Sequence, residues 1–169
     1  MSELVFVDTN VFVYARDAAE SKKQPIAAGW LARLWHEQRG RTSIQVLNEY
    51  YVTVTRELEP GLKRADAWED IQAILAWHPQ AIDAALIRRA RDIEDRHRLS
   101  WWDSLVVGAA QMQNCDILLS EDLQDRGEYG GLTVRSPFTF EVEEPTAGYA
   151  SPSTAAGSHP KRGRPIRSR

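Results

Sequence analysis

Four short polar segments each carry an acidic side chain near the expected end of a strand or the expected start of a helix. Their acids are Asp8, Glu49, Asp103 and Asp122. If the fold brings these acids together, they cannot all remain ionised without a cation, because like charges at close range raise one another's pKa. Carboxylate oxygens are ligands that suit Mg²⁺ and Mn²⁺. The residue types therefore predict a metal site of the kind that hydrolyses a phosphodiester bond.

Each acid also has a purely structural interpretation. Asp8 and Asp122 are placed to cap short helical turns, and Ser100-x-x-Asp103 has the spacing of a capping box. Glu49 fits a solvated position on a helix. The positions of Asp8 and Asp122 favour a functional role over a structural one. Both follow apolar strands, and ligands bind beyond the carboxyl ends of strands in open parallel sheets. Both interpretations stay open for each acid taken alone.

Short apolar runs alternate with longer amphipathic segments along the chain. Strands are expected at 4–7, 41–42, 116–120 and 132–134, longer helices at 26–35, 44–58, 65–77, 82–97 and 101–113, and one helical turn at 122–126. This alternation is typical of a parallel sheet whose crossovers are helices. We expect an α/β fold, a three-layer sandwich with a short central parallel sheet flanked by helices.

Charge divides the chain into two parts. All 24 acidic residues lie in residues 1–144, whereas five of the 21 basic residues lie in residues 145–169, a segment rich in Pro, Ala and Ser. We expect one domain over 1–144 and a disordered basic tail over 145–169. No apolar run is long enough to cross a bilayer, and the start of the chain lacks signal-peptide features, so a soluble cytoplasmic protein without membrane contact is expected. The one cysteine, Cys115, excludes an internal disulfide and a cysteine-based zinc site.

The order and spacing of four sequence blocks resemble the PIN domain family, and closely the VapC-type ribonuclease toxins of bacterial toxin–antitoxin pairs. The resemblance covers roughly residues 3–140, and its blocks are Phe6-Val7-Asp8-Thr9-Asn10, Asn48-Glu49, Leu99-Ser100-Trp101-Trp102-Asp103-Ser104-Leu105 and Ile117-Leu118-Leu119-Ser120-Glu121-Asp122-Leu123. The combination of four blocks is far more specific than any one of them.

The resemblance implies a Mg²⁺-dependent endoribonuclease, with Mn²⁺ as the other candidate ion, that leaves a 5′-phosphate and a 3′-hydroxyl. It assigns the metal and the catalytic role to Asp8, Glu49, Asp103 and Asp122, and a supporting role in orienting carboxylates or water to Thr9, Asn10 and Ser120. Glu121 and Asp125 compete with Asp122 for the fourth position. The implied partners are an RNA substrate, a second copy in a homodimer, and an antitoxin protein. Exposed apolar positions on the helices expected near 26–35 and 65–77 are candidate contact surfaces for such partners.

Two other classes of function are alternatives to a nuclease. A PIN-like module without catalysis would act through its partner or through the tail, where Arg162-Gly163-Arg164-Pro165 resembles an AT-hook able to make a weak DNA contact. A different α/β enzyme is disfavoured, since the chain lacks a G-x-G-x-x-G motif and has Asn10 where a phosphotransferase of the haloacid dehalogenase pattern needs a second aspartate. The histidines fall outside the acidic blocks, which argues against ribonuclease chemistry based on histidine as a general base.

Overall fold

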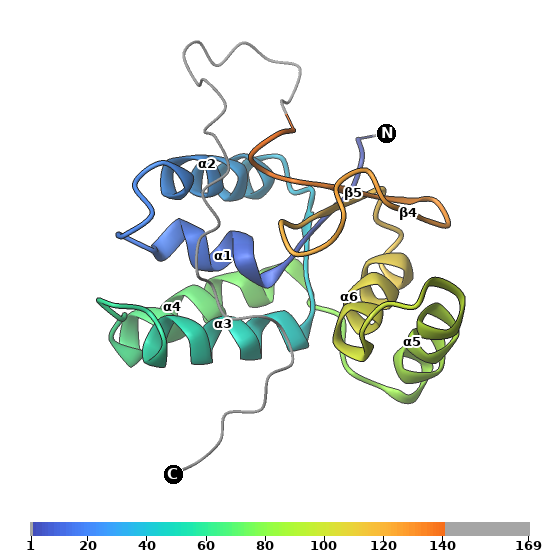
Figure 1. Cartoon of the computed structure of the whole chain (residues 1–169). Coiled ribbons are helices and arrows are strands. Elements are labelled where there is room, and N and C mark those ends of the chain that lie inside the picture. Colours follow the sequence, from blue (N-terminus) through green and yellow to red (C-terminus); the bar gives the residue numbers. More distant parts are fainter. Residues whose placement is uncertain (1, 141–169) are drawn as a thin grey trace.

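The computed structural model describes residues 2–140, and the architecture is the expected α/β sandwich around a short sheet (Figure 1). Its strands are β1 (Val5–Val7), β2 (Gly40–Arg41), β3 (Ile117–Leu119), β4 (Glu128–Tyr129) and β5 (Leu132–Arg135). The strand order is β2-β1-β3-β5-β4, and all neighbours are parallel except β4 and β5. β1 and β3 are buried along their whole length, which explains why both read as continuous apolar runs.

Helices cover the sheet on both sides. They are α1 (Thr9–Arg16), α2 (Lys23–His36), α3 (Ile44–Arg56), α4 (Arg64–Ile74), the short 3₁₀ helix η1 (Leu75–Trp77), α5 (Ala84–His97) and α6 (Trp101–Met112). α1 packs against α2 and α3, α4 packs against α3, and α5 packs against α6. Figure 1 shows α1 to α4 on the left of the sheet and the α5–α6 pair at its lower right.

Side-chain caps fix where several helices begin. Ser43 accepts a hydrogen bond from the amide of Val46 and so caps α3. Ser100 accepts one from the amide of Asp103, so the cap that its spacing to Asp103 predicts is confirmed. Asp83 caps α5 in the same way through the amide of Leu86. These caps set the first turns of α3 and α6, the helices that carry Glu49 and Asp103.

The middle of α6 is buried without interruption. Its residues from Ser104 to Ala110 are all buried. At Gly108 an added Cβ would lie only 3.1 Å from the Leu86 side chain, so the small residue lets α5 approach closely. Because the body of α6 is held inside the core, its first turn is held at the rim of the core, and Asp103 lies in that turn.

The structure differs from the sequence-based expectations in three local places. Residues 122–126 do not form a helical turn, because the amide of Arg126 donates to the carbonyl of Val134 in β5, at 2.7 Å, instead of to a carbonyl within the turn. The short strand β4 was not foreseen. The helix expected at 26–35 begins at Lys23 and ends at His36, before the left-handed residue Gln38.

Within residues 2–140, no helix is both long and apolar enough to span a membrane. The tail predicted over 145–169, with its DNA contact, lies outside the described residues, as does the predicted domain end at 144. The domain end, the tail and its DNA contact therefore stay predictions.

Candidate active site

The first acid lies where two central strands end. β1 and β3 are parallel and in register, with Val7 beside Leu119, so Asp8 and Ser120 follow them side by side. The amide of Asp8 continues the ladder to the carbonyl of Leu119 at 3.0 Å. Asp8 is therefore anchored by its backbone at the carboxyl edge of the sheet.

The carboxylate of Asp8 is completely buried, with 0% of the residue exposed, and it accepts hydrogen bonds on both oxygens. Oδ1 accepts from the amide of Thr9 at 2.7 Å. Oδ2 accepts from Oγ of Ser120 at 2.7 Å and from Nδ2 of Asn10 at 3.4 Å. Hydrogen bonds to an ionised acceptor are the strong ones, so these contacts hold the carboxylate in one orientation.

Glu49 is linked to Asp8 through Thr9. The Thr9 hydroxyl donates to Oε2 of Glu49 at 2.7 Å, while the Thr9 amide binds Asp8. Gln45, one turn earlier on α3, donates from Nε2 to Oε1 of Glu49 at 2.8 Å and to the carbonyl of Trp102 at 3.3 Å. Gln45 therefore joins the Glu49 side chain to the first turn of α6.

Asp103 lies in that first turn. Its amide donates to Oγ of Ser100 at 3.1 Å, so the capping role suggested by the sequence is present at the backbone. The negative charge of Asp103 also acts on Tyr129 in β4. Burial raises the pKa of Tyr129, and the charge of Asp103 raises it further. A cap and a role in the site do not exclude one another, because the cap uses the amide of Asp103 and leaves the carboxylate to other contacts.

The three acids near the end of β3 have different surroundings. The amide of Asp122 donates to Oγ of Ser120 at 3.1 Å, and Asp122 is exposed. Oε1 of Glu121 accepts from Nζ of Lys23 at 2.6 Å. Oδ1 of Asp125 accepts from the amide of Ser136 at 2.8 Å, which ties it to the chain beyond β5.

A continuous set of hydrogen bonds thus joins all four acidic segments, which lie more than 110 residues apart at the extremes. Among residues 2–140, however, no three His, Cys, Asp or Glu side chains form a group arranged to hold a metal ion. The donor set itself is chemically suitable, since it consists of hard oxygen atoms. The network around these acids also includes one buried acceptor, Oε1 of Gln45, that has no hydrogen-bond partner within the described part of the chain.

The sequence names Asp8, Glu49, Asp103 and Asp122 as candidates, and the structure adds two residues that the sequence did not indicate, Gln45 and Lys23. The spacing of Gln45, four residues before Glu49, is the signal that could have found the first, because residues at this spacing share a helix face. Nothing near Lys23 in the sequence points to Glu121, since the two are 98 residues apart.

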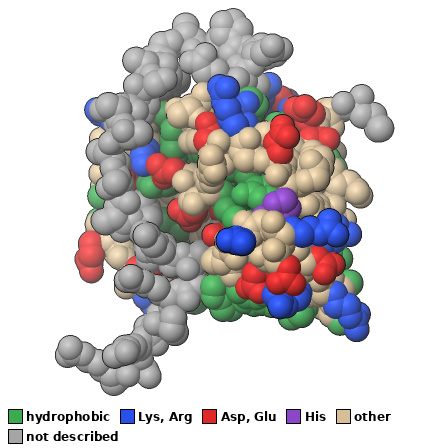
Figure 2. Space-filling view, turned by 45° about the vertical axis from the view of Figure 1, so that its right-hand side comes forward, with side chains coloured by type: hydrophobic (Ala, Val, Ile, Leu, Met, Phe, Trp, Pro, Cys, Tyr) green, Lys and Arg blue, Asp and Glu red, His purple; other side chains and the backbone are tan. Residues whose placement is uncertain are grey.

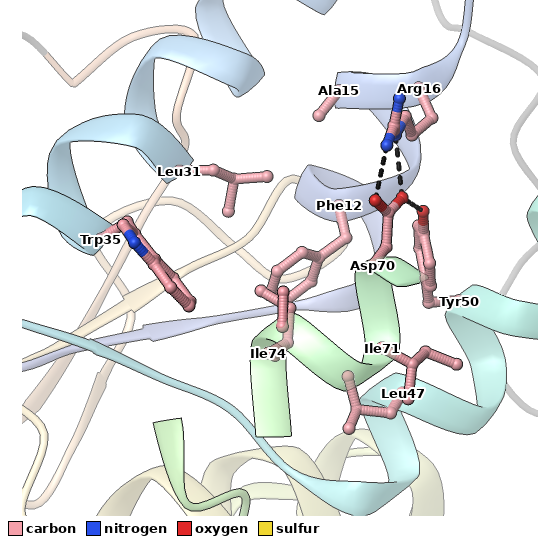
Figure 3. Close-up of a pocket in the computed structure, with 11 residues that line it drawn as sticks. Phe12, Ala15, Arg16, Leu31, Trp35, Leu47, Tyr50, Asp70, Ile71 and Ile74 are labelled. Carbon is pink, nitrogen blue, oxygen red and sulfur yellow. Dashed lines mark hydrogen bonds and ion pairs between the residues drawn. The ribbon is translucent and has the colours of Figure 1, made fainter. Parts of the chain in front are cut away.

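A separate apolar pocket lies among α1, α2, α3 and α4 (Figure 3). It has a volume of about 260 Å³, and its apolar wall includes Leu31, Trp35 and Ile71. Figure 3 shows Arg16 and Tyr50 both bound to the carboxylate of Asp70 at its edge, and the ion pair with Asp70 raises the pKa of Arg16 above its ordinary value. Trp35 keeps 46% of its surface exposed.

The arginine-rich helix α5 carries charges of both signs. Arg91 binds Glu94 at 2.9 Å and Asp95 at 2.5 Å on the same helix. Figure 2, which turns the α5–α6 side of the molecule forward, shows acidic and basic side chains interspersed across this face. The helix is a solvated surface of mixed charge, the arrangement that the alternating sequence favours.

Comparison with known proteins decides the family. The family model described as the PIN domain matches residues 5–124, which include the strand end at Asp8, the helices with Glu49 and Asp103, and the turn with Asp122. The chain belongs to the PIN domain family. Among curated proteins, none matches it.

Solved structures with the same fold include proteins of toxin–antitoxin systems. A toxin–antitoxin complex from Klebsiella pneumoniae has a chain that is 16% identical, with a TM-score of 0.59 over 82% of this PIN chain and 99% of that one. VapC20 of Mycobacterium tuberculosis, a toxin that cleaves the sarcin–ricin loop, is 21% identical, with a TM-score of 0.50 over 70% of this chain and 91% of that one. VapBC2 from Rickettsia felis, bound to a DNA fragment from its promoter, is 15% identical, with a TM-score of 0.50 over 79% and 98%. At these identities the likeness establishes the fold.

Proposed function

We propose that this PIN domain is a Mg²⁺-dependent endoribonuclease of the cytoplasm, the toxin of a toxin–antitoxin pair. The observation that carries the proposal is the hydrogen-bond network at the carboxyl edge of the sheet, in which a wholly buried Asp8 is joined through Ser120, Thr9 and Gln45 to the segments of the other three acids. Family membership and the toxin structures of the same fold support it.

In this proposal Asp8, Glu49, Asp103 and Asp122 would hold the ion, Mg²⁺ or Mn²⁺. When bound, the ion would lower the pKa of a water molecule and stabilise charge on the phosphate oxygens.

The other polar residues orient those acids. Ser120 and Asn10 fix the carboxylate of Asp8, while Thr9 and Gln45 each hold one oxygen of Glu49. Such fixed orientation reduces the rearrangement needed when substrate binds. The described histidines take no part in the network, so the chemistry proposed here assigns them no proton transfer.

The direct test is cleavage of RNA by wild type, Asp8→Asn and Asp103→Asn, with 5′ ends sequenced to locate the cuts. We expect each variant to lose at least about 100-fold in rate, equivalent to roughly 2.7 kcal/mol of transition-state stabilisation. Asp92→Asn is the matched control, because Asp92 is exposed on α5 and outside the network. Cleavage by both site variants at the wild-type rate would refute the assignment of the site.

The proposed antitoxin would bury an apolar segment in the pocket among α1 to α4. The support is the apolar wall with its exposed Trp35, together with the toxin–antitoxin complex that shares the fold. Buried tryptophans often contribute most to an interface. Trp35→Ala should therefore weaken antitoxin binding at least about tenfold, whereas Trp68→Ala, at an exposed position outside the pocket, should leave it unchanged. Equal antitoxin affinities of Trp35→Ala and wild type would place the antitoxin elsewhere.

The homodimer is proposed on the resemblance alone and is tested by the molecular mass of the protein in solution.

The basic tail supports a second candidate, a PIN module that acts by tethering to DNA. Deleting residues 145–169 separates the two functions, since the deletion removes Arg162-Gly163-Arg164-Pro165 and none of the network. The nuclease proposal expects full cleavage after the deletion. The tethering proposal expects cleavage in neither form and loss of DNA binding in the truncated one.

A further inference from the structure

Lys23 is a buried lysine that the proposed chemistry does not use. It lies at the start of α2, and only 8% of the residue is exposed. Burying an ammonium group costs free energy unless it is paired, so the groups around Lys23 must offset the cost of its burial.

The contacts of Lys23 surround its ammonium on several sides. Nζ donates to Oε1 of Glu121 at 2.6 Å and lies 3.3 Å from the hydroxyl of Tyr14. It also lies over two aromatic rings, 4.8 Å from the centre of Tyr14 and 5.1 Å from that of Phe138. Burial raises the pKa of Tyr14, and its hydrogen bond with Glu121 raises it further, so the phenol stays protonated beside the ion pair.

The ion pair fixes the segment that follows β3. Glu121 is held at its side chain by Lys23 and at its amide by Oδ1 of Asn10, at 3.1 Å. The next residue is Asp122, whose own amide is bound to Ser120 at 3.1 Å. The backbone next to Asp122 is therefore held to α2 by the Lys23–Glu121 ion pair. It is also held by hydrogen bonds to Asn10 and Ser120, the residues that bind Asp8.

We propose that Lys23 is a positioning residue: through Glu121 it holds the Asp122 segment against the candidate active site. Of the other two acids near the end of β3, Glu121 is the partner of Lys23 and Asp125 accepts from the amide of Ser136. The proposed nuclease function takes Asp122 as the fourth acid of the site. This inference rests on the proposed nuclease function for its kinetic part only.

The test compares Lys23→Met with Lys23→Arg and with Lys22→Met, which makes the same change at the exposed neighbouring residue. Amide hydrogen exchange over residues 120–126 is the first measurement, and it needs no activity. Lys23→Met should speed exchange in this segment at least about tenfold, Lys23→Arg should restore protection, and Lys22→Met should match wild type. Unchanged exchange in Lys23→Met would overturn the inference.

Kinetics on RNA give the second measurement, made well below the melting temperature of each variant. A displaced catalytic acid should lower kcat roughly 10- to 100-fold with KM nearly unchanged. A lysine that only stabilises the fold would lower the melting temperature and leave kcat at the wild-type value, which would contradict a positioning role. If Lys23→Met does not fold, Glu121→Gln carries the same two expectations. If wild type cleaves no RNA, the nuclease proposal fails, while the exchange comparison still decides whether Lys23 holds the segment.

Discussion

Replacing Ser120 with alanine removes the hydroxyl that joins three parts of the candidate site. Ser120 is completely buried. Its Oγ donates to Oδ2 of Asp8 at 2.7 Å and accepts from Nδ2 of Asn10 at 3.2 Å and from the amide of Asp122 at 3.1 Å. All four proposed acids remain in the variant, so the change tests the network separately from the charges.

The expected loss follows from the kinds of bond removed. A hydrogen bond to a charged group is worth about 1.5–3 kcal/mol. The amide of Asp122 belongs to an exposed residue and can turn to water, and Asn10 still reaches Asp8 at 3.4 Å. We therefore expect Ser120→Ala to lower the free energy of unfolding by about 2–3 kcal/mol, or the melting temperature by roughly 4–12 °C for a domain of this size.

Ser136→Ala is the matched control, since it makes the same chemical change after another parallel strand. Within residues 2–140, the bond that Oγ of Ser136 accepts is a local one, from the amide of Phe138 at 3.3 Å. Its loss should cost about 0.5–1 kcal/mol. Thermal melting followed by circular dichroism, with urea unfolding beside it, measures both variants. If Ser120→Ala melts no lower than Ser136→Ala, the network does not stabilise the site and the reasoning is refuted.

Two further predictions concern the core. Burial raises the pKa of the Cys115 thiol to about 12. The thiol of the unfolded chain ionises near pH 8.5, so above that pH the native state keeps a proton that the unfolded state loses. The free energy of unfolding should therefore fall by up to about 1.4 kcal/mol per pH unit from pH 9 upward. Urea unfolding at pH 8, 9 and 10 should show this slope in wild type and a shallower one in Cys115→Ala; equal slopes would contradict the assignment. Gly40→Ala would place its Cβ 2.3 Å from the Trp77 ring, so we expect the free energy of unfolding to fall by about 1–3 kcal/mol. Gly29→Ala, in α2 with no atom within 4 Å of the added Cβ, should raise the free energy of unfolding by about 0.5–1 kcal/mol. Melting temperatures that rank the two variants the other way would refute the packing argument.

The sequence predicted those elements whose signals are local. Ser43 and Ser100 stand one residue before an apolar helical pattern, and each caps the helix expected there. The central strands follow from continuous apolar runs, because a strand covered on both faces has no polar side. The edge strand β4 has only two residues, Glu128 and Tyr129, and two residues are too few to show any period.

What the sequence could not give depends on contacts between distant residues. A helical turn at 122–126 was reasonable from Asp122 alone, but the amide of Arg126 binds a strand that begins six residues later. The start of α2 at Lys23 was missed for a related reason. A lysine carries no hydrophobic signal, and what holds it in the interior is Glu121, near the other end of the domain.

Within the candidate site, too, contacts between distant residues could not be predicted from the sequence. The types and spacing of the four acids could be read from the chain, and so could the meeting of Asp8 with the residue after β3, because parallel strands end at a common edge. The bridge by Gln45 from Glu49 to the carbonyl of Trp102 depends on how α3 and α6 pack, which no local pattern encodes.

Calorimetric titration of Mg²⁺ into the purified full chain tests the central claim most directly. We predict saturable binding to wild type and to Asp92→Asn, no binding to Asp8→Asn or Asp103→Asn, and a rise in melting temperature with Mg²⁺ only where binding is seen. A wild-type chain that takes up no Mg²⁺, or site variants that bind it as tightly as wild type, would contradict the claim that these acids share one divalent ion.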